Sequence, residues 1–244
     1  MGFWRDWIHA GGTGGLNWHL HARAHRQQWQ PTCDLIENFL LKSSPANPHL
    51  VLIGASAGWM LPSRWLCQFQ RIDSYDIDPL ASWLFARRHG AQLRQAGVQL
   101  RAHRRDALAL LPEILREHQD ACLWFDNLLG QQRYRIRDEL ETERQLNALK
   151  IQLAGRTWGS IHDVFSGPGT LTLPTPQTLA QAKGRAQEFG DVRMQALLQQ
   201  LSASGTWFDH GTRGVFPGTT PVEMVSWPFR PGYWHWLQMG WCSA

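Results

Sequence analysis

Small residues and acidic residues that follow apolar runs are the part of this sequence best suited to chemistry. Gly54, Ser56 and Gly58 alternate with alanines directly after the apolar run 50–53, and a second apolar stretch leads to Asp76. Small residues let the backbone approach a ligand closely, and a carboxylate can accept hydrogen bonds from both hydroxyls of a ribose. The order of apolar run, small-residue turn, helix-length segment and acid therefore predicts a nucleotide-binding unit of strand, turn, helix and strand.

The elements that must position these residues alternate along the chain. Periodicity and turn residues predict a short helix before the glycine loop 11–15, a helix from about residue 17, and helices over 32–42, 80–89, 108–118, 131–154 and 183–202, with a further helix-length segment after Gly58. They predict strands at 50–53, 98–103, 121–125 and 160–165, and one more strand that ends at 75–78. Two aromatic-rich strands, 222–229 and 233–242, with a proline-glycine turn between them, predict a C-terminal hairpin. We expect an N-terminal helical lid or extension over 1–48 and a nucleotide-binding domain over 49–244.

The alternation of strands and helices, the GASAG turn at 54–58 and the final hairpin resemble the class I (Rossmann-like) S-adenosylmethionine-dependent methyltransferases. That family usually has GxGxG in this turn and often an acid two residues before the first glycine. Here Ser56 replaces the middle glycine and Leu52 replaces the acid. The resemblance implies an α/β fold with a Rossmann-like, doubly wound, mostly parallel sheet that ends in an antiparallel C-terminal β-hairpin. It also implies S-adenosyl-L-methionine as the cofactor.

The resemblance implies a role for individual residues around that cofactor. Asp76 would accept hydrogen bonds from the ribose hydroxyls, Ile77 would pack on the adenine, and Asp106 would lie near the adenine amino group. Open α/β sheets bind ligands at the carboxyl ends of their strands. Asp126 and Asn127, at the tip of the fourth strand, would therefore touch the methionine end of the cofactor or the acceptor. The implied cofactor-binding residues are Gly54, Ser56, Gly58, Asp76, Ile77, Asp106, Ala107, Asp126 and Asn127.

The acids around this site also have interpretations that need no ligand. Asp78, directly before a proline, is placed to cap the helix that follows. Asp106 follows two arginines and suits a surface ion pair, while Asp126 with Asn127 suits a loop-capping pair. A capping Asp78 and a ribose-binding Asp76 are compatible, because the two roles fall on different residues.

Methyl transfer is an in-line displacement that needs chiefly proximity and a desolvated acceptor. Where the acceptor carries a proton, a base near the methyl group assists the reaction. His162 and Asp163 lie at the tip of the fifth predicted strand, and histidine is the side chain poised near neutral pH. The candidate catalytic residues are therefore His162, Asp163 and Asp126, with His210 as a lesser alternative.

Composition excludes several other classes of protein. The apolar fraction is 43%, and no apolar run approaches the roughly 20 residues of a membrane span. The first residues lack the long apolar stretch of a secretory signal, so we expect a cytoplasmic protein. Four widely spaced cysteines predict free thiols, and His21 with His25, four residues apart, favour ordinary packing over a metal site. The net charge of +4 favours an anionic partner but does not by itself indicate nucleic acid.

The sequence thus favours methyl transfer to a small molecule over transfer to RNA, since no RNA-binding module is recognisable. A nicotinamide or flavin oxidoreductase would need GxGxxG spacing, which the turn lacks because Trp59 follows Gly58. An aminopropyl-transferring enzyme would need paired acids near the fourth strand, where Asp126 stands alone. A methyltransferase-fold protein that binds a ligand or partner without catalysis stays open, because the acid expected at Leu52 is missing.

Overall fold

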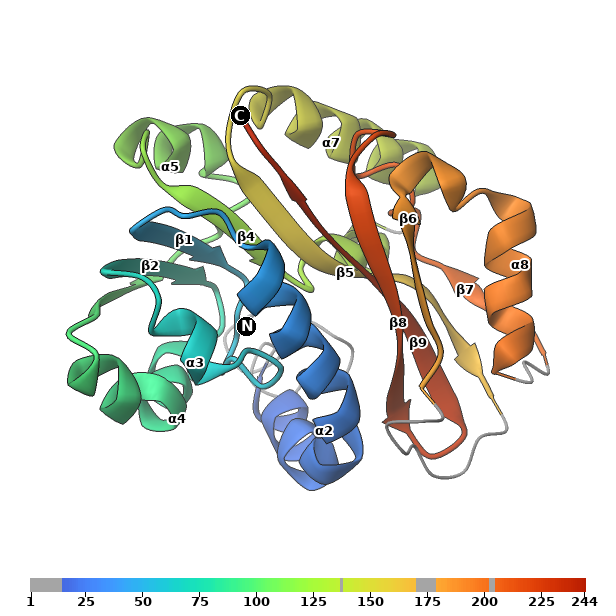
Figure 1. The fold of residues 1–244 in the computed structure, drawn as a ribbon, viewed down its shortest axis with the longest axis horizontal. Helices are drawn as coiled ribbons and strands as arrows, with labels where there is room; N and C mark the ends of the chain where they lie inside the picture. The colour runs from blue at the N-terminus through green and yellow to red at the C-terminus, as the bar shows by residue number, and fades with distance from the viewer. Residues whose placement is uncertain (1–14, 137, 170–178, 202–204) are drawn as a thin grey trace, which may run out of the picture.

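The computed structural model describes residues 15–136, 138–169, 179–201 and 205–244 of the 244-residue chain. These residues form a single twisted sheet with helices packed on both of its faces (Figure 1). The short helix predicted before the glycine loop, and most of the loop predicted at 167–177, lie outside the described residues.

The sheet confirms the predicted fold class. Its strands are β1 (His49–Ile53), β2 (Arg71–Asp76), β3 (Gln99–Arg104), β4 (Cys122–Asp126), β5 (Trp158–Pro168), β6 (Gln181–Arg185), β7 (Phe208–Asp209), β8 (Pro221–Arg230) and β9 (Tyr233–Cys242). They lie in the order β3-β2-β1-β4-β5-β9-β8-β6, with β7 beside β5. β1 to β5 are parallel and the later strands antiparallel, so the sheet is Rossmann-like with an antiparallel C-terminal part.

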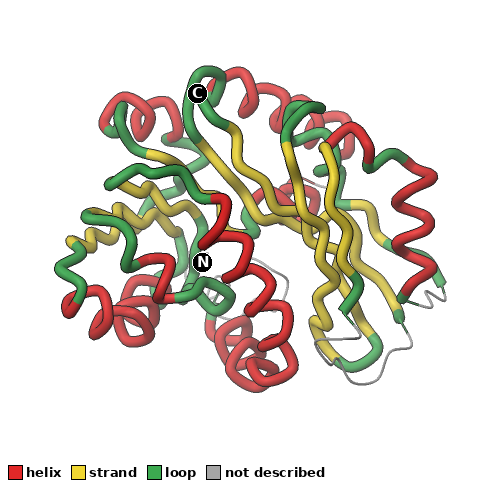
Figure 2. Tube along the Cα trace, viewed as in Figure 1, coloured by secondary structure: helices red, strands yellow, loops and turns green. Residues whose placement is uncertain are grey.

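Helices cover the two faces of this sheet as separate layers (Figure 2). They are α2 (Leu16–Ser43), α3 (Ser63–Leu66), α4 (Ala81–Gln95), α5 (Leu111–Glu117), α6 (Gln132–Ile136), α7 (Glu139–Gln152) and α8 (Asp191–Gln200). Alternate side chains of β1 point to opposite faces, as the two-residue period of a strand requires. Leu50 and Leu52 pack in a core with α2, α3 and α4, whereas Val51 and Ile53 pack in a second core with α5, α7 and α8.

The predicted hairpin is present, and it closes the carboxyl-terminal half of the sheet. β8 and β9 pair in antiparallel fashion, and Arg230 lies opposite Tyr233 across the turn. Gly232 has φ +70°, which suits glycine in a tight turn. β9 lies between β5 and β8, and the hairpin carries Trp227 and Phe229 to the face on which α2 packs, whereas Trp234 and Trp236 pack on the opposite face.

Several elements differ from the sequence-based expectation. The two N-terminal helices are one continuous helix, α2, that runs through Pro31, because Trp29 and Ile36 on either side of the proline bury in the same core. The helix expected after Gly58 shortens to the four-residue α3, since the buried Met60–Leu61 turn occupies the space. The predicted 131–154 helix is divided, and Asp138 caps α7 by accepting the N–H of Glu141 at 3.1 Å. The segment 181–185, expected to be partly helical, pairs with β8 as β6.

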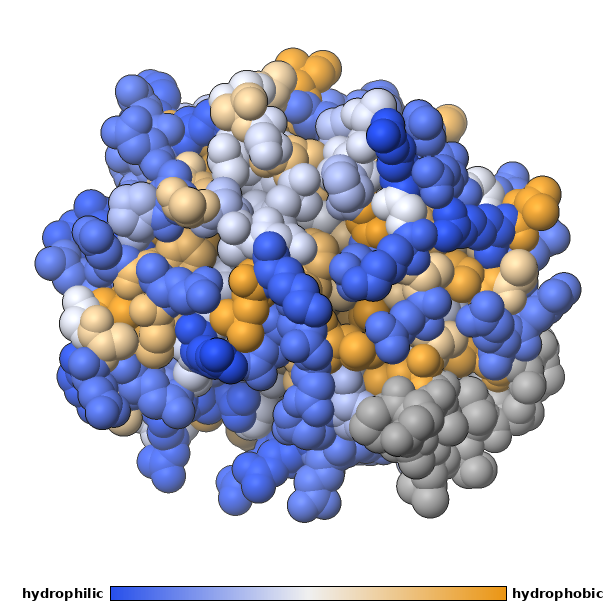
Figure 3. All heavy atoms as spheres, in the orientation of Figure 1, coloured by the Kyte–Doolittle hydropathy of each residue, from blue (hydrophilic) through white to orange (hydrophobic). Residues whose placement is uncertain are grey.

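Polar side chains cover most of the face shown in Figure 3, with apolar residues in patches between them. Over the described parts of the chain, no helix combines the length and apolar character needed to cross a membrane. All four cysteines are free thiols, as predicted, and Cys122 is fully buried.

Candidate functional site

A cleft opens at the carboxyl ends of the parallel strands β1, β2 and β4. Its empty space, which includes open solvent, is about 900 Å³. α2 and β8 supply one tryptophan each to its wall. The lining residues are Trp18, Gly54, Ala55, Ser56, Trp59, Met60, Tyr75, Asp76, Ile77, Arg105, Asp106, Ala107, Asp126, Asn127, Leu128, Gln131 and Trp227.

The small-residue turn after β1 forms the floor of the cleft. Gly54 has φ +73°, and a Cβ there would lie 2.9 Å from Cβ of Leu128, so the position requires glycine for both backbone and space. Ser56 has φ +51°, a conformation that non-glycine residues adopt at some cost. Its hydroxyl accepts the indole N–H of Trp18 at 3.1 Å. The serine that replaces the expected middle glycine thus ties α2 to the turn.

Asp76 is fixed in the cleft by two backbone donors. Ser56 N–H donates to Oδ2 at 2.7 Å, and Asp78 N–H donates to Oδ1 at 2.8 Å. Each carboxylate oxygen can accept a further hydrogen bond, because a carboxylate offers about four lone-pair positions. Burial raises the pKa of Asp76 to about 6, against the lowering effect of the two N–H groups.

Asp126 lies at the end of β4, also in the cleft wall. Burial, together with the nearby charge of Asp76, raises the pKa of Asp126 to about 8. Within the described residues no basic side chain forms an ion pair with either of these two carboxyls. The cleft therefore holds two carboxyl groups that have no ion-pair partner among the described residues, and a cationic or hydroxyl-rich ligand could pair with them.

Asp78 anchors the start of α2 beside this site. The indole N–H of Trp59 donates to Nδ1 of His19 at 3.1 Å, so Nε2 of His19 carries the proton and donates to Asp78 at 2.9 Å. Gly15 N–H donates to the same carboxylate oxygen at 2.7 Å. The other oxygen accepts the N–H of Leu80 at 2.8 Å, in the turn that precedes α4. The N-cap of α4 is Leu80 and no side chain caps this helix, so the predicted capping role of Asp78 is wrong and the carboxylate holds the preceding turn instead.

The structure gathers most of the residues named from the sequence for cofactor binding. Eight of the nine line the cleft, and Gly58 lies behind it. A Cβ at Gly58 would lie 2.6 Å from Nε2 of His89, so this glycine permits close packing of the turn against α4. Ile77 is 47% exposed at the cleft rim, where an apolar ligand surface could cover it. Whether these residues bind a cofactor stays a prediction.

His162 lies outside the cleft, contrary to the base role suggested for it. Its side chain is fully buried, with Nδ1 3.0 Å from Oγ of Ser160 and Nε2 3.3 Å from Oε1 of Gln238. Burial lowers the pKa of His162 to about 4. The side chains alternate along β5, and this one points into the core. A histidine with both ring nitrogens satisfied there has no route to a ligand in the cleft.

Asp163, the next residue on β5, belongs to a different set of contacts. Its Oδ1 lies 2.8 Å from Nδ1 of His235 on β9, and its backbone N–H donates to Oδ1 of Asn127 at 3.0 Å. Burial would raise the pKa of Asp163, but the charge and hydrogen bond of His235 outweigh it and the pKa is lowered. His210, the lesser alternative, bonds Gly130 carbonyl through Nδ1 at 2.8 Å and is buried beside this pair.

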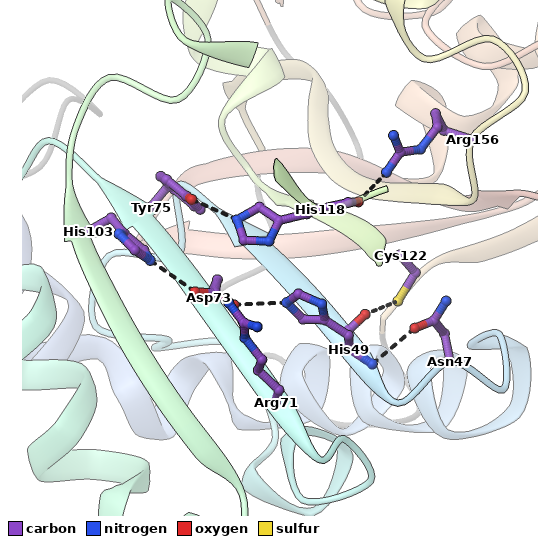
Figure 4. A network of polar contacts seen from close by, with 9 residues as sticks. All are labelled: Asn47, His49, Arg71, Asp73, Tyr75, His103, His118, Cys122 and Arg156. Carbon is purple, nitrogen blue, oxygen red and sulfur yellow. Dashed lines mark hydrogen bonds and ion pairs between the residues drawn. The ribbon is translucent and has the colours of Figure 1, made fainter. Parts of the chain in front are cut away.

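A second polar network joins β1, β2 and β3 (Figure 4). Buried Asp73 on β2 bonds Nε2 of His49 at 2.8 Å, Nε of Arg71 at 2.6 Å and Nε2 of His103 at 3.0 Å. His118 bonds the hydroxyl of Tyr75 at 2.8 Å. His49, Asp73 and His118 are close enough to share a cation, but it would compete with the guanidinium already on the carboxylate.

Several residues in or beside the cleft were not among the predicted site residues, and three of them are aromatic or imidazole side chains that bear on its chemistry. Trp18 and Trp227 line the cleft, and His235 lies behind it. The N-terminal segment, rich in tryptophan and histidine, was expected to form a lid or extension, but its composition does not say which side chains reach the cleft. Which of the fourteen tryptophans face a ligand depends on how α2 crosses the hairpin, and that is a tertiary contact without a local sequence signal.

Comparisons with known proteins found similar solved structures but no matching family. A scan of protein-family models and a search of curated proteins found no match. The chain is similar to a solved S-adenosylmethionine-dependent methyltransferase from Anabaena variabilis, with 15% identity, TM-score 0.43, and coverage of 96% of this chain and 98% of that one. It is also similar to magnesium protoporphyrin IX methyltransferase from Synechocystis, solved with bound S-adenosylmethionine. That match has 13% identity, TM-score 0.43, and coverage of 98% of this chain and 90% of that one.

A third similar structure, from Rhodobacter sphaeroides, is provisionally assigned as a zinc-dependent alcohol dehydrogenase (15% identity, TM-score 0.41, 82% of this chain and 87% of that one). Likenesses of this size assign no residue of this chain a role. The function proposed below therefore depends on the side chains of this chain.

Proposed function

We propose that this protein is a methyltransferase that binds S-adenosyl-L-methionine in the cleft and acts on a small-molecule acceptor. The observation that carries the proposal is the position of Asp76. Its carboxylate follows β2, is held by two backbone N–H groups at 2.7 and 2.8 Å, and lies beside the turn that begins at Gly54. Such a carboxylate can accept from two adjacent hydroxyls without moving.

The remaining cleft residues fit the chemistry of that cofactor. Gly54 leaves no side chain between the backbone and the ligand, and the exposed side chain of Ile77 offers an apolar surface for a base. S-adenosylmethionine supplies a methyl group on a positively charged sulfur. Asp126, whose carboxyl has no protein cation as partner among the described residues, would favour that charge.

We also infer that α2 is one wall of the site rather than a detached extension. Trp18 lines the cleft and donates to Ser56 of the turn, and His19 is held by Asp78. These contacts join residues 16–43 to both ends of the nucleotide-binding unit. The N-terminal segment would then help to shape the acceptor end of the cleft, where a small molecule fits.

Calorimetric titration with S-adenosylhomocysteine tests the cofactor proposal. The wild-type protein is expected to bind it with micromolar affinity, and Asp76→Asn is expected to lose about tenfold or more, because one charged acceptor for two hydroxyls is removed. Glu143→Gln, which changes an exposed carboxylate on α7, is the matched control and should leave binding unchanged. Absence of binding by the wild-type protein, with NAD and FAD titrated alongside, would refute the methyltransferase proposal.

A further inference from the structure

His235 has one ring nitrogen that the folded chain leaves without a partner. The residue is 7% exposed, and its Nδ1 lies 2.8 Å from Oδ1 of Asp163. Because an ionised carboxylate only accepts, Nδ1 carries the proton and Nε2 presents a lone pair. Nε2 is buried and, within the described parts of the chain, makes no hydrogen bond. A buried polar atom left unsatisfied costs free energy and marks a position where a ligand group can bind.

This nitrogen belongs to a side chain that packs directly behind the cleft. Asn127 lines the cleft and accepts the backbone N–H of Asp163 at 3.0 Å. Trp227 lines the cleft too, and its ring centroid is 5.0 Å from that of His235. Phe229 and Tyr233, both half-buried, have ring centroids 4.8 and 5.6 Å from the imidazole. The unpartnered nitrogen is thus set among aromatic side chains at the edge of the candidate site.

The neighbouring histidine is different, because its hydrogen bonds are complete. His210 donates from Nδ1 to the carbonyl of Gly130, so its Nε2 accepts, and Oγ of Ser166 lies 2.9 Å from it. Ser166 in turn accepts the hydroxyl of Tyr233 at 3.1 Å. Asp163, His210 and His235 are near enough to share a cation, but Ser166 satisfies His210 and the imidazole of His235 satisfies Asp163. The contacts therefore favour a proton site over a metal site.

We propose that His235 is the base that takes the proton of the methyl acceptor, that Asp163 positions it, and that the acceptor is a hydroxyl group on an aromatic ring. The proposal rests on the proposed function. A phenol keeps its proton at neutral pH, as tyrosine does with a pKa of about 10, so its methylation gains from a base. Aromatic walls suit a flat ring. As the oxygen–methyl bond forms, the O–H proton passes to Nε2, and the electron pair of the broken carbon–sulfur bond stays on sulfur. The imidazolium then releases its proton to water.

The test uses 4-nitrophenol as the probe and needs no cofactor. Its ionised form absorbs visible light and its neutral form does not, so absorbance reports transfer of its proton. At about pH 6, where free probe is mostly neutral, the wild-type protein is expected to convert the bound probe to phenolate. His235→Gln should abolish this signal, and Asp163→Asn should reduce it about tenfold or more. His118→Gln, which changes a histidine with the same 7% exposure in the Asp73 network, should leave it unchanged.

Imidazole nitrogen NMR separates positioning from folding. In the wild-type protein His235 is expected to show the tautomer protonated at Nδ1, and Asp163→Asn should shift it toward the other tautomer while the rest of the spectrum stays folded. Phenolate that persists in His235→Gln, a probe that does not bind, or a signal that a chelator removes would each overturn the proposal. Failure of S-adenosylhomocysteine binding with an intact phenolate signal would instead refute only the proposed function.

Discussion

Asp73 and Asp163 are both buried carboxylates that bond histidine, yet they sit in opposite electrostatic settings. Asp73 accepts from Arg71, His49 and His103, and the hydrogen bonds of these groups lower its pKa against the raising effect of burial. Asp163 bonds one imidazole, and over the described chain no arginine or lysine pairs with it. One carboxylate is paired with a permanent cation, and the other is hydrogen-bonded to an imidazole with no permanent cation beside it.

The difference separates a structural cluster from one that can do chemistry. Around Asp73 the carboxylate oxygens are used by partners on β1, β2 and β3, so the network fastens three strands together (Figure 4). Around Asp163 the series of hydrogen bonds ends at Nε2 of His235, which has no hydrogen-bond partner among the described residues. A base must keep a free lone pair, and a fully satisfied network cannot supply one.

Breaking the Asp73 network should have the largest effect on stability. Asp73→Asn leaves Arg71 and two imidazoles without their charged acceptor, which we expect to lower the free energy of unfolding by about 3 kcal/mol. Because the partners of Asp73 are partly exposed, this loss of stability lies at the lower end of the range expected when one member of a buried ion pair is removed. Urea denaturation measures the change.

Binding of S-adenosylhomocysteine supplies the control for that variant, because Asp73 lies away from the cleft and affinity should be unchanged while stability falls. Asp163→Asn should show the reverse ranking, with a smaller loss of stability and a large loss of the phenolate signal. If the two variants lose equal stability and equal signal, the distinction between the clusters is wrong.

The cleft carboxyl of Asp126 should respond to pH in the opposite sense to Asp73. The folded pKa of Asp126, about 8, lies above its unfolded value of about 4, so its contribution to stability is complete at low pH and disappears as pH rises through 8. Asp126→Asn removes this loss. The variant should match the wild type near pH 4 and exceed it by about 2 kcal/mol above pH 8, a figure discounted for water in the cleft.

Thermal unfolding at several pH values measures that difference. Asp73, whose pKa is lowered, stabilises the fold above its unfolded pKa and loses that contribution as pH falls through its folded pKa. An Asp126→Asn variant whose advantage shrinks with rising pH would show that the carboxyl is already ionised at neutral pH.

The sequence predicted the framework better than the chemistry, for a physical reason. β1, the acid at the end of β2 and the C-terminal hairpin each follow from local patterns of apolar, small and turn residues. The contact between Asp163 and His235 joins residues 72 positions apart across two strands, and no local pattern encodes it. His162, next to Asp163, was named because it shares the strand tip, but alternation along β5 sends it into the core.

The smallest effect is expected at the rim of the Asp73 network. His103 is 31% exposed, donates one hydrogen bond to Asp73 at 3.0 Å, and stacks on Tyr75 with centroids 4.4 Å apart. His103→Gln should cost less than about 1 kcal/mol, because water or the new amide can reach the same carboxylate oxygen. In the Asp73→Asn background the same change should cost almost nothing, since the shared bond is already lost. A double-mutant cycle by urea denaturation measures the coupling. A loss from His103→Gln alone that equals that of Asp73→Asn would mean that the imidazole, and not Arg71, supplies the main compensating charge.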